Sequence, residues 1–255
     1  MSHRYGSTDA HDSAGQPWAG RSFQPNPRAD DDGTADPGLL AALVAFRAGE
    51  SGQASVIAAL RDVRLLVPLL AEAGEVGLTP EGRVVDKTQE LSLVTVQAPS
   101  GGPAIPAFTS VAAMGQWNAG ARPVPVESAR VALAAGAESA VVVIDAAGPT
   151  EFGLQRSALA AVATGTDWVP PWSDDEVLAA FASCLVEPEI VAADVLPGDP
   201  EARLHGPEVL VRLALRPGLD RAQLDALLGR VQQRWAAAEV LAARVGAYAI
   251  SLVAA

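Results

Sequence analysis

The pattern of apolar and polar positions predicts a mixed set of helices and strands from about residue 37 onward. Leu39, Leu43 and Phe46 recur near helical spacing and predict a first helix that begins near Pro37. Shorter apolar runs and turn residues divide the chain that follows. There we expect helices over 53–61, 110–117, 127–135 and 156–164, and strands over 63–70, 90–98, 104–109, 123–126, 140–145 and 151–155.

The first three of these strands, over 63–70, 90–98 and 104–109, follow one another through turn-rich segments. This order favours a meander of antiparallel strands. Pro68 cannot donate a hydrogen bond to a neighbouring strand, so we expect the first strand at an edge. The run over 140–145 is almost wholly apolar. Such a run is typical of a strand that is covered on both faces.

Several residues at helix ends carry recognisable capping chemistry. Gly136 and Gly165 follow two predicted helices and are expected at the position just beyond the last turn. Ser173 is expected to cap the helix VLAAFASCL. The acidic run over 174–176 then falls at the start of that helix. There it suits the positive end of the helix dipole better than a metal site.

The proline-rich segment over 166–176 is the best candidate for a boundary. After it we expect a strand over 190–197, a polar turn over 198–206, a strand over 208–217, an amphipathic helix over 224–235 and a closing strand over 247–254. This order describes a β-β-α-β unit, which is a small α+β sandwich.

These patterns divide the chain into four regions and predict an α+β fold with α/β character. The first region is polar and ends in an acidic run, so we expect a disordered tail, either simply solvated or an acidic docking arm. A mixed-sheet domain and the smaller α+β unit follow. The regions are the tail at 1–36, the N-terminal domain at 37–168, a linker and helix at 169–186, and the C-terminal unit at 187–255.

Charge excludes two classes of partner. The 255 residues include 30 acidic and 18 basic side chains, which gives a formal charge of -12, and Lys87 is the only lysine. The arginines form no basic stripe, so we expect neither nucleic-acid binding nor attachment to an anionic membrane surface. No apolar run is long enough to cross a membrane, and no signal peptide is recognisable, so we expect a cytoplasmic protein.

The common catalytic and cofactor-binding patterns are missing from the sequence. It contains no GxGxxG after a strand, no P-loop and no GxSxG. The three histidines, His3, His11 and His205, lie in polar segments, and Cys184 is the only cysteine. Cys184 sits in an apolar stretch and is interpreted as a buried structural thiol rather than a nucleophile. We therefore expect no catalytic set, no cofactor and no metal site.

Six phrases of the sequence together resemble the SseB family. They are LLVPLL, LTPEGRVVDK, PAFTSVAAMGQW, ARPVPV, VVIDAAGP and LQRSALAA. The resemblance runs from about residue 40 to 172 and implies an SseB-type N-terminal domain. The unit over 187–255 looks like the C-terminal part of actinobacterial relatives. No established activity, cofactor or catalytic residue comes with the resemblance.

One carboxylate remains a candidate for chemistry. Asp145 ends the buried strand beside a turn, where α/β proteins often place functional groups. In the first interpretation its carboxylate accepts backbone N–H bonds from the AAGP turn. In the others it binds a ligand or acts in catalysis, with Arg122 or Arg156 nearby, or it forms a salt bridge.

Three tryptophans are candidates for contacts. Trp117, Trp168 and Trp172 lie near proline-rich segments, where tryptophans often pack domains together. Exposed tryptophans also serve as anchors for partner proteins. Both interpretations remain open at this point.

We therefore expect a non-enzymatic accessory or protein-interaction module of the SseB family that binds a protein partner, with homo-oligomerisation left open. The alternative is a small-molecule-binding or carboxylate-dependent enzyme that uses the region around Asp145. A structural subunit of a secretion apparatus ranks last, because it rests only on the family name.

Overall fold

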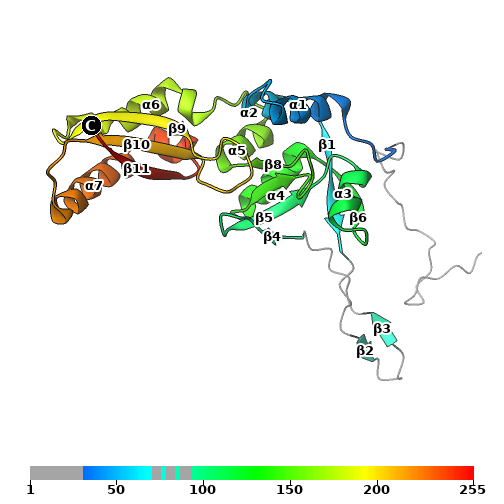
Figure 1. Cartoon of the computed structure of the whole chain (residues 1–255). Coiled ribbons are helices and arrows are strands. Elements are labelled where there is room, and N and C mark those ends of the chain that lie inside the picture. Colours follow the sequence, from blue (N-terminus) through cyan, green and yellow to red (C-terminus); the bar gives the residue numbers. More distant parts are fainter. Residues whose placement is uncertain (1–30, 71–75, 79–83, 87–93) are drawn as a thin grey trace, which may run out of the picture. The chain divides into compact units, whose positions relative to one another are not determined.

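The computed structural model describes residues 31–70, 76–78, 84–86 and 94–255. Of these, Gly33–Ala255 form one compact unit of helices and mixed sheets, which confirms the predicted α+β class (Figure 1). Most of the predicted tail lies outside the described residues. The division of the remainder into two domains stays a prediction.

Two short helices open the described fold. α1 (Pro37–Arg47) begins after Asp36, whose side chain accepts a hydrogen bond of 2.9 Å from the Leu39 N–H. α2 (Gln53–Ala59) follows after a short connection. Both helices are found where the apolar spacing predicts them, and their apolar faces enter the main core.

The strand pairing differs from the predicted meander. β1 (Arg64–Leu69) pairs antiparallel with β6 (Arg122–Glu127), and Pro68 lies opposite Pro123. β1 and β6 form a two-stranded sheet, which agrees with the predicted edge position of β1, and Leu66 also bridges to Phe108. The meander prediction is right for its second and third strands, because β4 (Val96–Gln97) and β5 (Pro103–Ala107) pair antiparallel. It is wrong for the first strand, whose strand partner is β6. Packing of apolar faces, rather than order along the chain, decides which strands become neighbours.

A four-stranded mixed sheet forms the centre of the N-terminal part, in the order β4-β5-β7-β8. β5 runs parallel to β7 and antiparallel to β4, while β7 and β8 form an antiparallel pair. Parallel neighbours need a crossover, which the helices α3 and α4 supply. The elements are β4 (Val96–Gln97), β5 (Pro103–Ala107), α3 (Val111–Trp117), α4 (Ser128–Ala137), β7 (Val141–Ile144), β8 (Phe152–Leu154) and α5 (Arg156–Thr164).

Within 63–98 the expected strands are only partly found. The predicted strand over 90–98 contributes Val96–Gln97, and residues 90–93 lie outside the described part. The segment that we expected as a turn-rich loop contains two short strands, β2 (Val76–Leu78) and β3 (Val84–Asp86), which pair antiparallel.

Of the two glycines that we expected just beyond helix ends, one is found there and one is not. Gly165 ends α5 with φ 67°, in the left-handed region that glycine adopts easily, as the sequence predicts. α4 instead continues through Gly136 to Ala137, and the positive φ of 53° falls on Ser139. The glycine prediction fails there because the turn that redirects the chain lies three residues later.

β7 is covered on both faces, as its apolar sequence predicts. Val142 and Ile144 join the main core with α4 and α5, while Val141 and Val143 pack against a cluster that contains Leu204. Leu204 belongs to the connection over 198–208. We expected a polar turn over 198–206, and turns and bends are found there, but the segment also carries Leu204, which is only 1% exposed.

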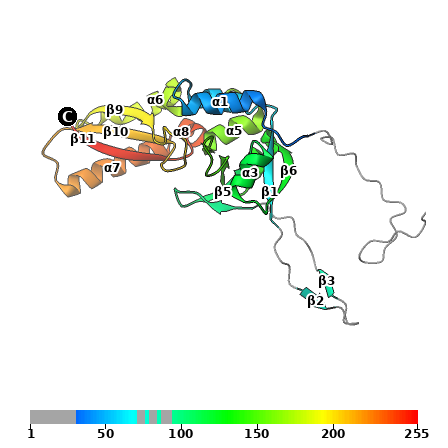
Figure 2. The same ribbon diagram turned by 45° about the vertical axis from the view of Figure 1, so that its right-hand side comes forward.

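The C-terminal elements form a three-stranded sheet with helices, in the strand order β11-β10-β9 (Figure 2). β10 is antiparallel to β9 and parallel to β11, which confirms the β-β-α-β pattern. The structure adds α8, which the pattern did not predict. The elements are the 3₁₀ helices η1 (Pro171–Ser173) and η2 (Ser183–Val186), α6 (Asp175–Ala182), β9 (Ile190–Pro197), β10 (Val209–Leu215), α7 (Arg221–Ala236), α8 (Glu239–Arg244) and β11 (Tyr248–Ala254).

Two details of this region bear on the sequence predictions. Asp174, rather than Ser173, caps α6, and its side chain accepts hydrogen bonds from the N–H groups of Glu176 and Val177. Cys184 is fully buried in the C-terminal core, and this burial raises the pKa of its thiol. The interpretation of Cys184 as a structural thiol is therefore supported by its environment.

Candidate functional site

The carboxylate of Asp145 is saturated by hydrogen bonds inside the N-terminal core. It accepts from the N–H of Thr109 at 2.8 Å, from the Thr109 hydroxyl at 2.9 and 3.1 Å, and from the Thr150 hydroxyl at 2.7 Å. The side chain is 1% exposed. Its donors therefore come from Thr109 and Thr150. The first interpretation of Asp145 named the wrong donors, because the hydrogen bonds do not come from the AAGP turn.

The two arginines proposed to accompany Asp145 lie elsewhere. Arg122 is exposed on β6, and Arg156 is exposed at the first position of α5. Neither forms an ion pair or hydrogen bond with Asp145 in the described part of the chain. The structure therefore does not assemble the predicted Asp145 site.

The three candidate tryptophans lie in two places: Trp117 is on α3, whereas Trp168 and Trp172 contact each other. Trp117 is half-buried and packs against Phe108, with ring centroids 5.3 Å apart. Trp168 packs on the main N-terminal core and Trp172 on the C-terminal core, and their rings meet edge to face at 5.9 Å. Trp168 and Trp172 thus join the two cores, as the packing interpretation predicts, while Trp117 supports α3.

A short chain of hydrogen bonds extends from Trp168 into the buried contact between α5, Glu208 and Gly246, which we call the seam. The indole Nε1–H of Trp168 donates to the Ser157 hydroxyl at 2.8 Å, and that hydroxyl donates to Glu208. The other oxygen of Glu208 accepts the N–H of Gly246 at 2.5 Å. Glu208 is 2% exposed, and the loss of solvent raises its pKa even though these hydrogen bonds favour the charged form.

Gly246 is required where the seam is tightest. A Cβ atom at this position would lie 2.8 Å from the Cβ of Arg156 and 3.0 Å from Oε2 of Glu208. Any larger residue would push α5 away from the segment that precedes β11. Gly246 therefore lets the backbone approach α5 closely enough to hydrogen-bond Glu208.

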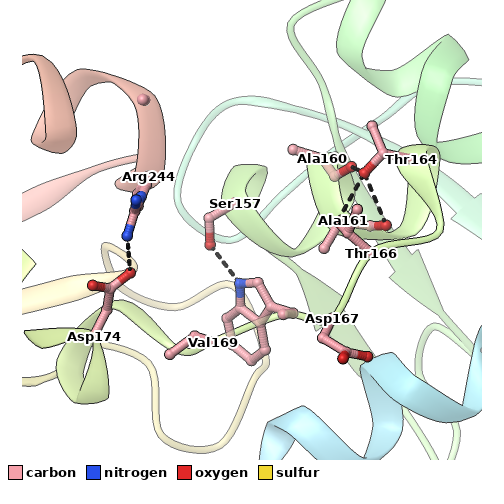
Figure 3. A pocket seen from close by; sticks show the side chains of 11 residues that line it. Ser157, Ala160, Ala161, Thr164, Thr166, Asp167, Val169, Asp174 and Arg244 are labelled. Carbon is pink, nitrogen blue, oxygen red and sulfur yellow. Dashed lines mark hydrogen bonds and ion pairs between the residues drawn. The ribbon is translucent and has the colours of Figure 1, made fainter. Parts of the chain in front are cut away.

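A pocket of about 350 Å³ opens beside this seam (Figure 3). Ser157 and Trp168 form part of its lining, together with Asp174 and Arg244. Arg244 pairs with Asp174 at 2.9 Å. Burial alone would raise the pKa of Asp174, but the hydrogen bonds from Arg244 and two backbone N–H groups outweigh it and leave that pKa lowered. Asp174 and Arg244 are therefore already engaged with one another, while Asp167 of the same lining pairs with Arg61.

A second, more apolar pocket of about 420 Å³ lies along α4 and α5. Its lining is dominated by small residues and by Leu133, whose side chain is 60% exposed. Arg156 is the only charged residue of this lining. Among the described residues Arg156 has no ion-pair partner, so its guanidinium is available to an acidic group.

The two pockets meet at one small side chain. Ala160 is exposed on α5 and lines both of them. We define the α5 surface by six residues, each of which lines one or both pockets. They are Leu133, Arg156, Ala160, Thr164, Trp168 and Val169.

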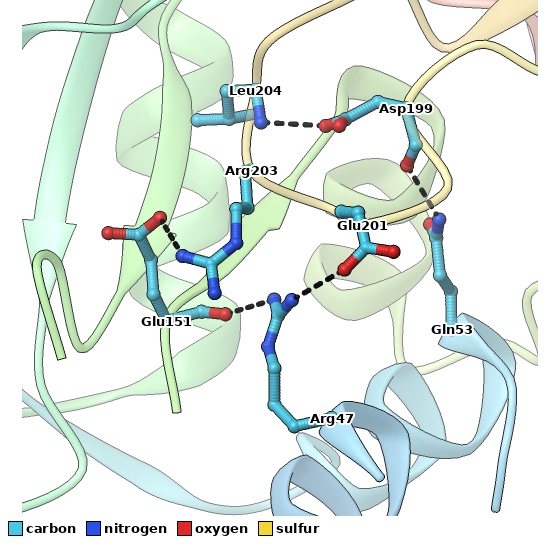
Figure 4. A network of polar contacts seen from close by, with 7 residues as sticks. All are labelled: Arg47, Gln53, Glu151, Asp199, Glu201, Arg203 and Leu204. Atoms are coloured by element: carbon cyan, nitrogen blue, oxygen red, sulfur yellow. Dashed lines mark hydrogen bonds and ion pairs between the residues drawn. The ribbon is translucent and has the colours of Figure 1, made fainter. Parts of the chain in front are cut away.

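A polar network holds the 198–208 connection against the N-terminal elements (Figure 4). Arg203 pairs with Glu151 at 3.1 Å, and Arg47 pairs with Glu201 at 3.6 Å while donating to the carbonyl of Glu151. Gln53 donates to the carbonyl of Asp199 at 3.0 Å. This network anchors the connection whose Leu204 covers β7.

Sequence reasoning missed most of this arrangement. Ser157, Ala160 and Glu208 carry no local pattern that distinguishes them from ordinary surface residues. The one available signal was Leu204, an isolated leucine in an otherwise polar segment.

Comparison with known protein families identifies part of this chain. Residues 39–161 match the family model of the SseB protein N-terminal domain. The chain contains an SseB N-terminal domain. This SseB domain extends from α1 into α5 and includes Ser157 and Ala160, whereas Trp168 lies beyond the matched residues.

No curated protein and no solved structure gave a significant match to this chain. No described helix has the length and apolar character needed to cross a membrane. In the described ranges, no group of three or more His, Cys, Asp or Glu residues is arranged to hold a metal ion.

Proposed function

We propose that this SseB protein is a non-enzymatic interaction module that binds a protein partner through the α5 surface. The observation that carries this proposal is the meeting of two pockets at Ala160, with the exposed Leu133 on one side and Val169 on the other. Val169 is 54% exposed. Adjacent apolar residues in concave surroundings are typical of protein contact sites.

The chemistry of the pockets favours recognition over catalysis. In the pocket beside Trp168, the Ser157 hydroxyl is engaged by Trp168 and Glu208, and Asp174 caps α6 while pairing with Arg244. A nucleophile or general base needs a lone pair or proton that faces the reactant. These groups already use theirs to hold the fold together.

The apolar pocket indicates the kind of segment that binds. Its small lining residues allow close approach of a partner backbone, and Arg156 supplies one cation with no ion-pair partner among the described residues. We infer a partner segment with apolar side chains and an acidic group beside them. We also propose that the protein and this partner bind each other in the cytoplasm.

The alternative, an enzyme centred on Asp145, finds no support in the geometry. The Asp145 carboxylate is buried and accepts hydrogen bonds from three donors, the N–H and hydroxyl of Thr109 and the hydroxyl of Thr150. It lines neither of the two pockets at the α5 surface. The geometry therefore offers no specific observation that favours this alternative.

Affinity purification from the native cell, with quantitative mass spectrometry, tests the proposal. Ala160→Arg places a long charged side chain between the two pockets, and the matched control Ala179→Arg makes the same change on the exposed face of α6. We expect a partner enriched with wild type and control to fall at least about tenfold with Ala160→Arg, a change of about 1.4 kcal/mol. Equal recovery with all three chains would contradict the proposal.

A charge reversal tests the chemistry of the partner. Arg156→Glu should weaken capture of the same partner, because it places an anion beside the acidic group. Arg130→Glu, on an exposed part of α4 outside the pocket, is the control and should leave capture unchanged. Unchanged binding by Arg156→Glu would show that the partner presents no acidic group at Arg156.

A further inference from the structure

The two edges of the C-terminal sheet are built differently. β9 forms one edge and β11 the other, with β10 between them (Figure 1). The β9 edge carries the exposed Asp194, ends in Pro197, and has a register irregularity opposite Ala214 and Leu215. A charge, a proline and a bulge are the devices by which proteins keep edge strands from pairing with other chains.

β11 has none of these protective devices. The sequence of Tyr248–Ala254 is YAISLVA, without a charged residue or a proline, and its register with β10 is regular over all seven residues. Leu252 and Val253 are 39% and 40% exposed. Successive residues of a strand point to opposite faces, so apolar side chains are exposed on both faces of this edge.

The sequence of β11 is also suited to antiparallel pairing with a second copy of the same strand. In an antiparallel pair of two β11 strands centred on Ser251, Ile250 lies opposite Leu252 and Ala249 lies opposite Val253. The half-exposed Leu252 would then meet an apolar neighbour on the face that carries the core. Val253 would meet the small Ala249 on the other face. Apolar pairs directly across an antiparallel ladder stabilise it.

We propose that β11 pairs antiparallel with β11 of a second copy of this chain, about a two-fold axis near Ser251. The two three-stranded sheets then form one six-stranded sheet. A two-fold contact of this kind is closed, and the protected β9 edges keep the assembly from growing into a fibre. The proposal is independent of the α5 surface, which lies on other elements.

Size and charge set the expected strength of this dimer. One pair of seven-residue strands buries less than the roughly 800 Å² per partner of a standard stable interface, so we expect association in the micromolar range. Each copy brings a formal charge of -12. Added salt screens this repulsion and should strengthen the dimer.

Sedimentation equilibrium of the full chain tests the proposal, with concentration and salt varied together. Wild type should rise toward twice the 26.1 kDa chain mass as either increases. Val253→Lys adds a charge to the β11 edge and should keep the mass at that of one chain. The matched control Val191→Lys, at an exposed position of β9, should behave as wild type.

Hydrogen exchange of the wild-type chain gives a readout that needs no variant. Amides of 248–254 should exchange more slowly at high protein concentration than at low, while those of β9 should not change. A chain that stays monomeric at every concentration would overturn the proposal. So would a dimer that both lysine variants disrupt equally, or slowed exchange of β11 only when a different protein is added.

Discussion

Two polar contacts hold the C-terminal elements against the SseB domain, and they differ in burial. The first is the Arg47–Glu201 ion pair, in which the Glu201 side chain is 76% exposed. The second joins Glu208 to Ser157 and Gly246, and Glu208 is 2% exposed. Exposed ion pairs contribute about 0–1 kcal/mol, whereas a buried polar group that loses its hydrogen bond costs about 1–3 kcal/mol. We therefore expect the exposed ion pair to contribute less to stability than the buried contact.

Leu204 should carry most of the stability of the 198–208 connection. It is 1% exposed and packs so closely on Gly153 that a Cβ atom there would overlap it. Leu204→Ala should lower the free energy of unfolding by about 3 kcal/mol, because it leaves a cavity beside β7. Urea denaturation followed by circular dichroism measures this loss. A loss below about 1 kcal/mol would show that the leucine is not what fixes the connection.

Glu208 should impose a pH dependence on the seam. Its pKa in the folded protein is raised, so its contribution is most favourable at low pH, below the ordinary value of 4.5, and is lost as pH rises through the folded pKa. Glu208→Gln keeps an acceptor for the Gly246 N–H and removes the buried charge. The stability of this variant relative to wild type should therefore improve from pH 4.5 to pH 7.

Thermal unfolding across that pH range is the check. Glu176→Gln is a suitable control, since Glu176 is exposed beside Arg244. A constant difference between Glu208→Gln and wild type at all pH values would mean that Glu208 keeps an ordinary pKa in the fold.

Glu201 should have the smallest effect of the three. Glu201→Gln removes its pairing with Arg47, but the distance is 3.6 Å and the carboxylate is mostly solvated. The expected loss is at most about 0.5 kcal/mol and should shrink further in high salt. Chemical denaturation at two salt concentrations measures it. A loss as large as that of Leu204→Ala would contradict the minor role of this exposed ion pair.

Local pattern was enough to predict most elements of this fold. Apolar spacing placed α1 and α7, and the run over 140–145 indicated a strand covered on both faces. It did not reveal that β1 pairs with β6, or that the second cover of β7 comes from Leu204. Those contacts join residues far apart in the chain, and no local period encodes them.

The candidate site was predicted only in part, for the same reason. Trp168 and Trp172 stood out because tryptophans near proline-rich segments often pack domains together, and the structure packs their rings against each other. Ala160 became relevant only through its position between two pockets. Asp145 drew attention from its place at a strand end, but its donors come from Thr109 and Thr150. Composition identified the residue types, and only the fold showed which of them face solvent.

The central claim is that the α5 surface binds a partner, and hydrogen exchange on the purified partner complex tests it most directly. Compared with the free chain, amides over 156–169 should exchange more slowly in the complex, while those of α6 should be unchanged. Protection confined to α6, α7 or β9, with 156–169 unaffected, would contradict the account.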